Sequence, residues 1–122
     1  MTHWVAVFLG AGLGGVLRYA VALWVARHFS THFPLATFLV NVTGCLLIGL
    51  ALPLIGQRET ARLLLVVGVL GGYTTFSTFG FETYRAIRDG MTGLALFYAA
   101  SSVLSGLAAV WLGVWMARRP SL

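Results

Sequence analysis

Residues 71–79 read Gly71-Gly72-Tyr73-Thr74-Thr75-Phe76-Ser77-Thr78-Phe79, inside an apolar run long enough to cross a lipid bilayer. Two glycines followed by hydroxyl and aromatic residues make a poor uninterrupted membrane helix. Backbone that leaves helical geometry at membrane depth is tolerated only where protein or a water-filled cavity covers it. Broken helices in membrane proteins often surround an ion or substrate site. This stretch therefore indicates a small protein that moves a solute across a membrane.

The composition around this stretch is that of a membrane protein. Of the 122 residues, 59% are hydrophobic and 9% are charged, whereas soluble domains carry about 25% charged residues. The net charge of +5 comes from arginine alone. Most arginines end apolar runs, where they meet lipid headgroups, so we expect no nucleic-acid partner. The one cysteine, Cys45, cannot form an intrachain disulfide or a multi-cysteine metal site.

Four apolar runs are each long enough to span a bilayer, which takes about 20 residues. They cover roughly residues 4–26, 34–56, 62–84 and 92–117. The first run lacks the positive residues that open a secretory signal, so we expect no cleavage. The sequence predicts an all-α membrane protein with one four-span domain over residues 1–122 and a break in the third span.

The arginines are almost evenly divided between the two ends of these spans. One side holds Arg58, Arg62, Arg118 and Arg119, and the other holds Arg27, Arg85 and Arg88. Since the side richer in arginine normally sets the orientation, a difference of one hardly selects either. Either other features fix the topology, or the chain inserts both ways round and pairs as an antiparallel dimer.

The first two spans each carry a polar residue that requires an explanation. Arg18 lies about two-thirds along the first span, where a charge is a functional-site hypothesis by default, although its side chain can also snorkel to the interface. Thr37 and Asn41 share one helical face of the second span. Asn41 either ties two helices together or presents a hydrogen-bond donor to a polar path. In the first span, Gly10 and Gly14 have the spacing that lets helices approach closely.

The last two spans offer aromatic edges, carbonyls and hydroxyls. Phe76 and Phe79 align if the helix resumes after the break, and their positive ring edges can face a small anion. Such a pair is also common in a core or against lipid. Unwound backbone around Gly71 to Thr75 would free carbonyl oxygens for a bare cation such as Na⁺. Tyr98 and Ser102 lie on approximately one face of the fourth span and either tie helices or bond a passing ion.

The sequence lacks the residues that several classes of function require. No span centre carries a carboxylate, because Glu59 and Asp89 fall in connections and Glu82 falls near the end of the third span. This argues against a proton-coupled cation exporter, which needs such a group. No nucleophile–base constellation, phosphate loop or metal-ligand cluster occurs, so we expect no enzyme. A membrane assembly subunit that transports nothing remains a further alternative.

Three motifs occur in order along the first three spans. They are Gly14-Gly15-Val16-Leu17-Arg18-Tyr19, Thr37-Phe38-Leu39-Val40-Asn41-Val42-Thr43-Gly44 and the stretch 71–79. With its length, four spans and balanced charge, the chain resembles the small bacterial fluoride channels of the Fluc (CrcB) type over almost its whole length.

The resemblance implies a channel that lets cytoplasmic fluoride leave passively through a bacterial inner membrane. It implies a dual-topology antiparallel homodimer with two parallel fluoride pathways.

Phe76 and Phe79 are similar to the aromatic box whose ring edges contact fluoride, and Asn41 is similar to the pore-facing asparagine of that family. The carbonyls of Gly71 and Thr74 are similar to the donors to a central structural Na⁺ at the dimer interface. The resemblance extends the polar track to Ser77, Thr37, Tyr98 and Ser102. Arg18, as a cation near an aqueous vestibule, would draw anions in.

Overall fold

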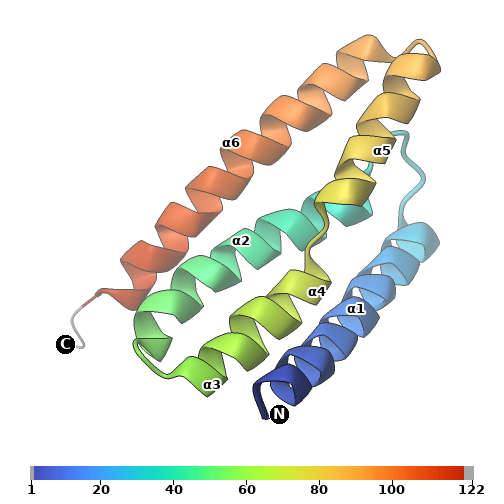
Figure 1. The fold of residues 1–122 in the computed structure, drawn as a ribbon. Helices are drawn as coiled ribbons and strands as arrows, with labels where there is room; N and C mark the ends of the chain where they lie inside the picture. Colours follow the sequence, from blue (N-terminus) through green and yellow to red (C-terminus); the bar gives the residue numbers. More distant parts are fainter. Residues whose placement is uncertain (1, 120–122) are drawn as a thin grey trace.

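The chain folds into a bundle of long helices in the computed structural model, which describes residues 2–119 (Figure 1). Three long helices are continuous: α1 (Thr2–His28), α2 (Leu35–Ile55) and α6 (Thr92–Ala117). With the segment Glu59–Arg88 they make four helices long and apolar enough to cross a membrane, and residues 2–119 contain no strand. The predicted all-α membrane class is therefore confirmed. Met1 and residues 120–122, which the predicted domain includes, lie outside the described residues.

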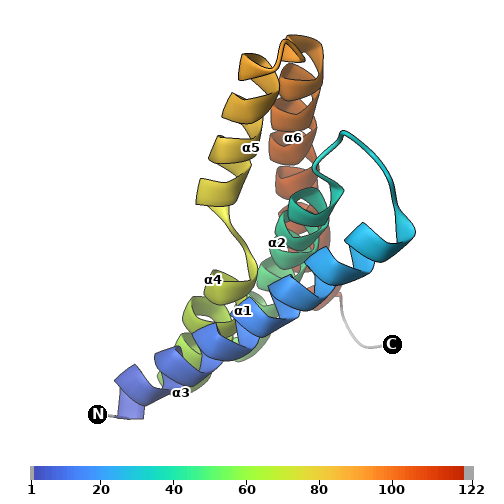
Figure 2. The same cartoon turned by 90° about the vertical axis from the view of Figure 1, so that its right-hand side faces the viewer.

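The third span is built from four pieces rather than one helix. A short α3 (Glu59–Ala61) leads into the π-helical η1 (Arg62–Leu70) and the short α4 (Gly71–Tyr73). After two extended residues, α5 (Phe76–Arg88) resumes. Figure 2 shows that α5 leaves at an angle to the line of α3 and α4, so the break divides the span into two differently directed halves.

Two helix pairs pack closely because glycines remove side chains from their contact lines. On α1, a Cβ added to Gly10 would meet the carbonyl of Leu64, and one added to Gly14 would meet the carbonyl of Val69. On α6, a Cβ on Gly113 would lie 2.7 Å from the nitrogen of Leu50 in α2. Thus α1 holds the first half of the broken span while α2 packs along α6 (Figure 1), as small residues allow in lipid.

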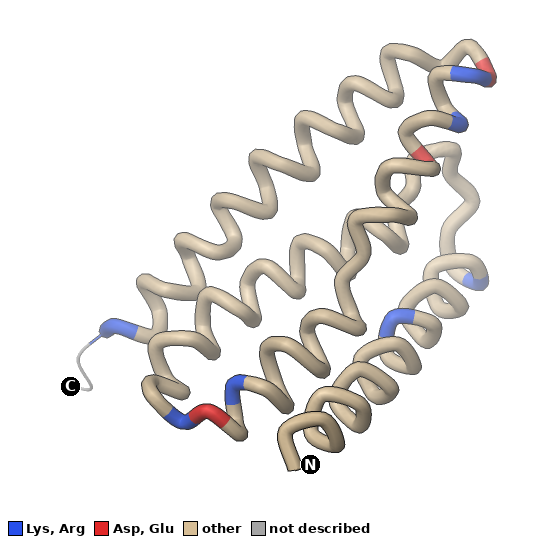
Figure 3. The backbone as a smooth tube through the Cα atoms, viewed as in Figure 1, with Lys and Arg blue, Asp and Glu red and all other residues tan. Residues whose placement is uncertain are grey.

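The outer surface is apolar along the helices and charged at their ends. Large side chains such as Trp4 (81% exposed), Phe8 (77%) and Trp111 (80%) point outward from the single chain. Figure 3 shows most charged residues gathered at the two ends of the bundle, with an arginine well inside α1 and an acid inside α5. These two are Arg18 and Glu82, and both prove to line one cavity.

Candidate functional site

The break in the third span lies at Thr74 and Thr75. Both residues have extended backbone, with ψ of 159° and 122°, between the helical ends of α4 and α5. Thr75 is the N-cap of α5, and its hydroxyl accepts a hydrogen bond from the N–H of Thr78 at 3.3 Å. Threonines suit this place because their hydroxyls offer the backbone an alternative to helical bonds. The expected unwinding from Gly71 was too wide, since Gly71–Tyr73 stay helical.

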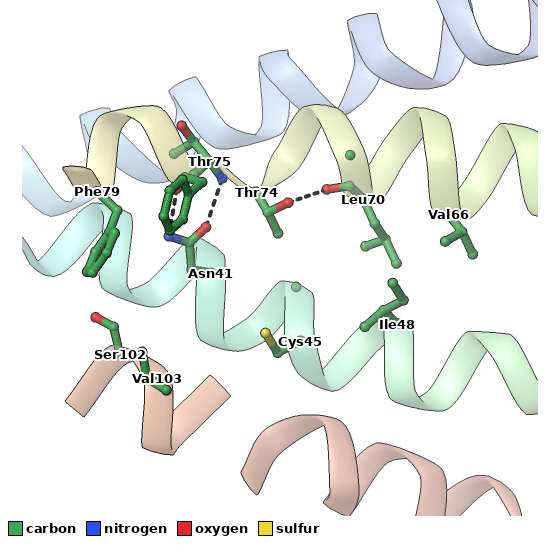
Figure 4. A pocket seen from close by; sticks show the side chains of 13 residues that line it. Asn41, Cys45, Ile48, Val66, Leu70, Thr74, Thr75, Phe79, Ser102 and Val103 are labelled. Atoms are coloured by element: carbon green, nitrogen blue, oxygen red, sulfur yellow. Dashed lines mark hydrogen bonds between the residues drawn. The ribbon is translucent and has the colours of Figure 1, made fainter. Parts of the chain in front are cut away.

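Asn41 on α2 holds the extended backbone at the break (Figure 4). Its Nδ2 donates to the carbonyl of Thr75 at 2.9 Å, and its Oδ1 accepts from the N–H of Thr75 at 2.8 Å. One side chain therefore satisfies both backbone groups of a buried residue that lies outside any helix. The amide has a second N–H, for which residues 2–119 provide no hydrogen-bond acceptor, and the side chain borders a cavity.

The hydrogen bonds at the break take away the helical donors of two carbonyls, those of Gly71 and Thr74. The N–H of Thr75, which would close the next helical turn onto Gly71, donates to Asn41 instead. Likewise the N–H of Thr78, which would bond the carbonyl of Thr74, donates to the Thr75 hydroxyl. Gly71 is exposed in the single chain. Two oxygens that the resemblance assigns to Na⁺ are therefore freed from their helical partners.

A cavity of about 370 Å³ opens beside the break, which we call the break cavity. Its wall includes Asn41, Gly71, Thr74, Phe76, Phe79 and Ser102, from α2, the broken span and α6. The rings of Phe76 and Phe79 have centroids 5.7 Å apart and an interplanar angle of 39°, and Phe76 is 83% exposed. The hydroxyl of Ser102, drawn near the Phe79 ring in Figure 4, is buried without a hydrogen-bond partner among the described residues. The break cavity thus joins aromatic edges to unused polar donors.

A second cavity of about 370 Å³, which we call the arginine cavity, shares Thr75 with the break cavity. Thr75 borders both cavities, and the arginine cavity is also lined by Arg18, Thr37, Thr78 and Glu82. In residues 2–119 the one ion pair joins Arg88 to Asp89 at 3.0 Å, so the guanidinium of Arg18 is unpaired within the described chain. A cation and a carboxylate thus line one cavity without forming a direct ion pair.

Glu82 is the polar centre that the sequence reasoning missed. Its Oε1 accepts a hydrogen bond from the hydroxyl of Thr37 at 2.8 Å, and its Oε2 accepts one from the hydroxyl of Tyr98 at 2.7 Å. Glu82 follows Phe79 by three residues, so helical spacing places both on one side of α5. That spacing is the signal for Glu82 in the sequence, whereas its position near the end of a span alone does not indicate a site.

Tyr98 and Ser77 are the predicted pathway residues that line neither cavity. Tyr98 is 1% exposed and its ring centroid lies 5.1 Å from that of Phe79, so it links Glu82 to the aromatic pair. Ser77 borders neither cavity; it is exposed at the start of α5, with its hydroxyl 3.4 Å from that of Thr75. The structure therefore brings all the predicted pathway residues to the two cavities or to the side chains that line them, with Ser77 reaching them only through Thr75.

Comparison with known proteins gives consistent matches over nearly the whole chain. The family model described as "CrcB-like protein, Camphor Resistance (CrcB)" matches residues 5–114. A protein named fluoride-specific ion channel FluC from Chloroflexus aurantiacus is 47% identical over 122 residues, covering 97% of each chain. Proteins of the same name are 46% identical in Acidobacterium capsulatum, covering 95% of this chain and 94% of that one, and 45% identical in Solibacter usitatus, covering 93% and 96%.

Proposed function

Because this chain belongs to the CrcB-like protein family, we propose that it is a fluoride-selective ion channel, and not an enzyme, through which cytoplasmic fluoride leaves passively. The observation that carries the proposal is the pair of rings, Phe76 and Phe79, at a cavity beside a clamped break in a membrane span. The name of its relatives, fluoride-specific ion channel, supports the choice of ion.

The break cavity offers fluoride weak, neutral contacts in place of water. The second N–H of Asn41 and the unpartnered hydroxyl of Ser102 are donors that can replace hydration water. The edges of the Phe76 and Phe79 rings carry partial positive charge. No full charge lines this cavity, so an anion that enters is also able to leave, as conduction requires.

Fluoride would reach the break from the arginine cavity. The unpaired guanidinium of Arg18 raises the local concentration of anions there. The hydroxyls of Thr37 and Tyr98 already donate to Glu82. Fluoride can therefore accept a hydrogen bond from either hydroxyl only when that hydroxyl leaves the Glu82 carboxylate. This competition limits how long fluoride stays bound to these hydroxyls. Ser77, exposed at the start of α5, would join this polar track from the outer side.

A structural Na⁺ fits the carbonyls of Gly71 and Thr74. Both have lost their helical donors, and carbonyl oxygens suit a bare alkali cation. Two carbonyls per chain leave the ion under-coordinated, whereas two chains meeting at the break provide four. Purification with N-methylglucamine in place of Na⁺ should lower both the dimer fraction and fluoride flux, and unchanged values for both would contradict this site.

The assembly we propose is an antiparallel homodimer with two fluoride pathways, each chain being one four-span domain over residues 1–122. The arginines at both ends of the bundle and the outward apolar side chains support it (Figure 3). We place this multi-pass protein in a bacterial inner membrane. Passive export suffices there, because HF enters uncharged and dissociates in the more neutral cytoplasm.

The deciding experiment is efflux from liposomes that hold the purified chain and KF, with valinomycin present and a fluoride electrode outside. We expect fast fluoride release, negligible chloride release from KCl-loaded liposomes, and no need for a proton gradient. Flux that collapses with the proton gradient would indicate a proton-coupled exporter. Absence of any flux from folded dimer would indicate an assembly subunit.

A further inference from the structure

The connection between α1 and α2 carries an aromatic side chain that reaches the site from outside it. Phe33 is half-buried, and its backbone is held on both sides: its N–H donates to the Thr31 hydroxyl at 3.1 Å, and its carbonyl accepts from the N–H of Leu35 at 2.7 Å. Pro34, which follows, has a fixed φ. The ring of Phe33 is therefore mounted on a short, restrained connection.

From this mount the Phe33 ring packs edge-on against Tyr98. Their centroids are 5.3 Å apart with an interplanar angle of 82°, the T-shaped geometry that aromatic pairs prefer. Phe38 and Phe97 also pack against the Phe33 ring, with their centroids 5.4 Å and 5.9 Å from its centroid. Tyr98 is thus in ring contact with Phe33 of the connection as well as with Phe79 of the broken span.

The contacts continue to the centre of the site. The ring centroids of Phe33 and Tyr98 are 5.3 Å apart, those of Tyr98 and Phe79 are 5.1 Å apart, and those of Phe79 and Phe76 are 5.7 Å apart. Tyr98 also donates its hydroxyl to Glu82. The position of this nearly inaccessible tyrosine is therefore defined by Phe33, Phe79 and Glu82 together.

We infer that Phe33 is a positioning residue of the ion pathway, which through Tyr98 sets the place of Phe79 and the hydrogen bond to Glu82. The inference rests on the proposed function. A core packed at native density does not close completely over a deleted ring, so without Phe33 the tyrosine gains room to turn. Turning would lengthen the Tyr98–Glu82 hydrogen bond and release one side of the Phe79 ring.

Fluoride efflux from liposomes gives the first test. Phe33→Ala should lower the flux by up to about tenfold, no more than removal of the Phe79 ring itself, because it displaces the groups that Tyr98 holds without deleting them. Phe33→Leu, which refills most of the space beside Tyr98, should restore most of it. Phe29→Ala is the matched control: Phe29 is in the same connection but packs on Trp24, with centroids 5.6 Å apart, so this variant should conduct as the parent does.

A second readout does not depend on transport. With 3-fluorotyrosine incorporated at Tyr98, the ¹⁹F resonance of the folded protein should shift or broaden in Phe33→Ala and stay in place in Phe29→Ala. An unchanged resonance, or a changed resonance with unchanged flux, overturns the inference. If Phe33→Ala does not fold, Phe33→Val takes its place with the same expectations. A parent chain without fluoride flux would overturn the proposed function, and the resonance alone would then decide whether Phe33 positions Tyr98.

Discussion

At the residue scale, the two phenylalanines at the break cavity have the most direct expected effect. Phe76→Ile or Phe79→Ile removes a ring edge from the cavity and breaks an aromatic pair, an interaction worth about 0.5–1.5 kcal/mol, so fluoride flux should fall by up to about tenfold for each. Phe81→Ile is the matched control, because Phe81 is on the same helix, is 57% exposed and borders neither cavity. Liposome efflux measures all three, and equal rates would remove the aromatic pair from the mechanism.

Asn41 both holds the backbone of Thr75 and offers a hydrogen-bond donor to fluoride, and one substitution of nearly equal volume removes both roles. Asn41→Asp replaces the Nδ2 donor by an oxygen facing the Thr75 carbonyl, which should cost about 1–3 kcal/mol of stability and also abolish the donor to fluoride. Thermal unfolding in detergent and liposome efflux measure the two losses.

Thr43→Val is the matched control for Asn41. It removes another hydrogen bond from the same helix, that of Thr43 to the Tyr73 hydroxyl at 2.9 Å, but this bond is exposed and does not hold the break. We expect a stability change within about 0.5 kcal/mol. If Asn41→Asp behaved as Thr43→Val does, the clamp on Thr75 would not matter for folding or conduction.

At the element scale, the position of the broken span depends on its close contact with α1. The backbones of α1 and η1 touch at Gly14, where an added Cβ would lie 2.8 Å from the nitrogen of Tyr73, one residue before the break. Gly14→Ala should therefore push the end of α4 away and destabilise the protein by about 1–3 kcal/mol.

Gly12→Ala tests whether the contact, and not the loss of glycine, causes the Gly14 effect. A Cβ on Gly12 meets nothing within 4 Å, and alanine favours helix over glycine by up to about 1 kcal/mol. Thermal unfolding should show a lower midpoint for Gly14→Ala and an equal or higher midpoint for Gly12→Ala. The reverse order would show that α1 does not hold η1 as described.

At the scale of the whole molecule, the even division of arginines predicts two insertion orientations. Two variants bias the chain in opposite directions. One combines Arg85→Gln with Arg88→Gln, and the other combines Arg58→Gln, Arg62→Gln and Arg118→Gln. Each should insert one way only, because the remaining arginines then lie mainly on one side.

Fluoride tolerance of a host that lacks its own fluoride exporter measures the outcome. Either biased variant alone should protect poorly, since it lacks an antiparallel partner, and the two expressed together should restore protection. Full protection by one variant alone would mean that antiparallel pairing is not required.

The sequence by itself determined the features that depend on local chemistry. Hydropathy runs marked four membrane-crossing segments, and hydroxyl residues after two glycines marked the break, because both signals lie in neighbouring residues. Tertiary structure alone decided that the break is confined to Thr74 and Thr75, since Asn41, 34 residues away, takes the backbone bonds of Thr75. It also decided that Glu82 gathers Thr37 and Tyr98 and that Phe33 packs on Tyr98. Such pairs form where helices meet, and the packing of whole helices sets them rather than any pattern within one segment.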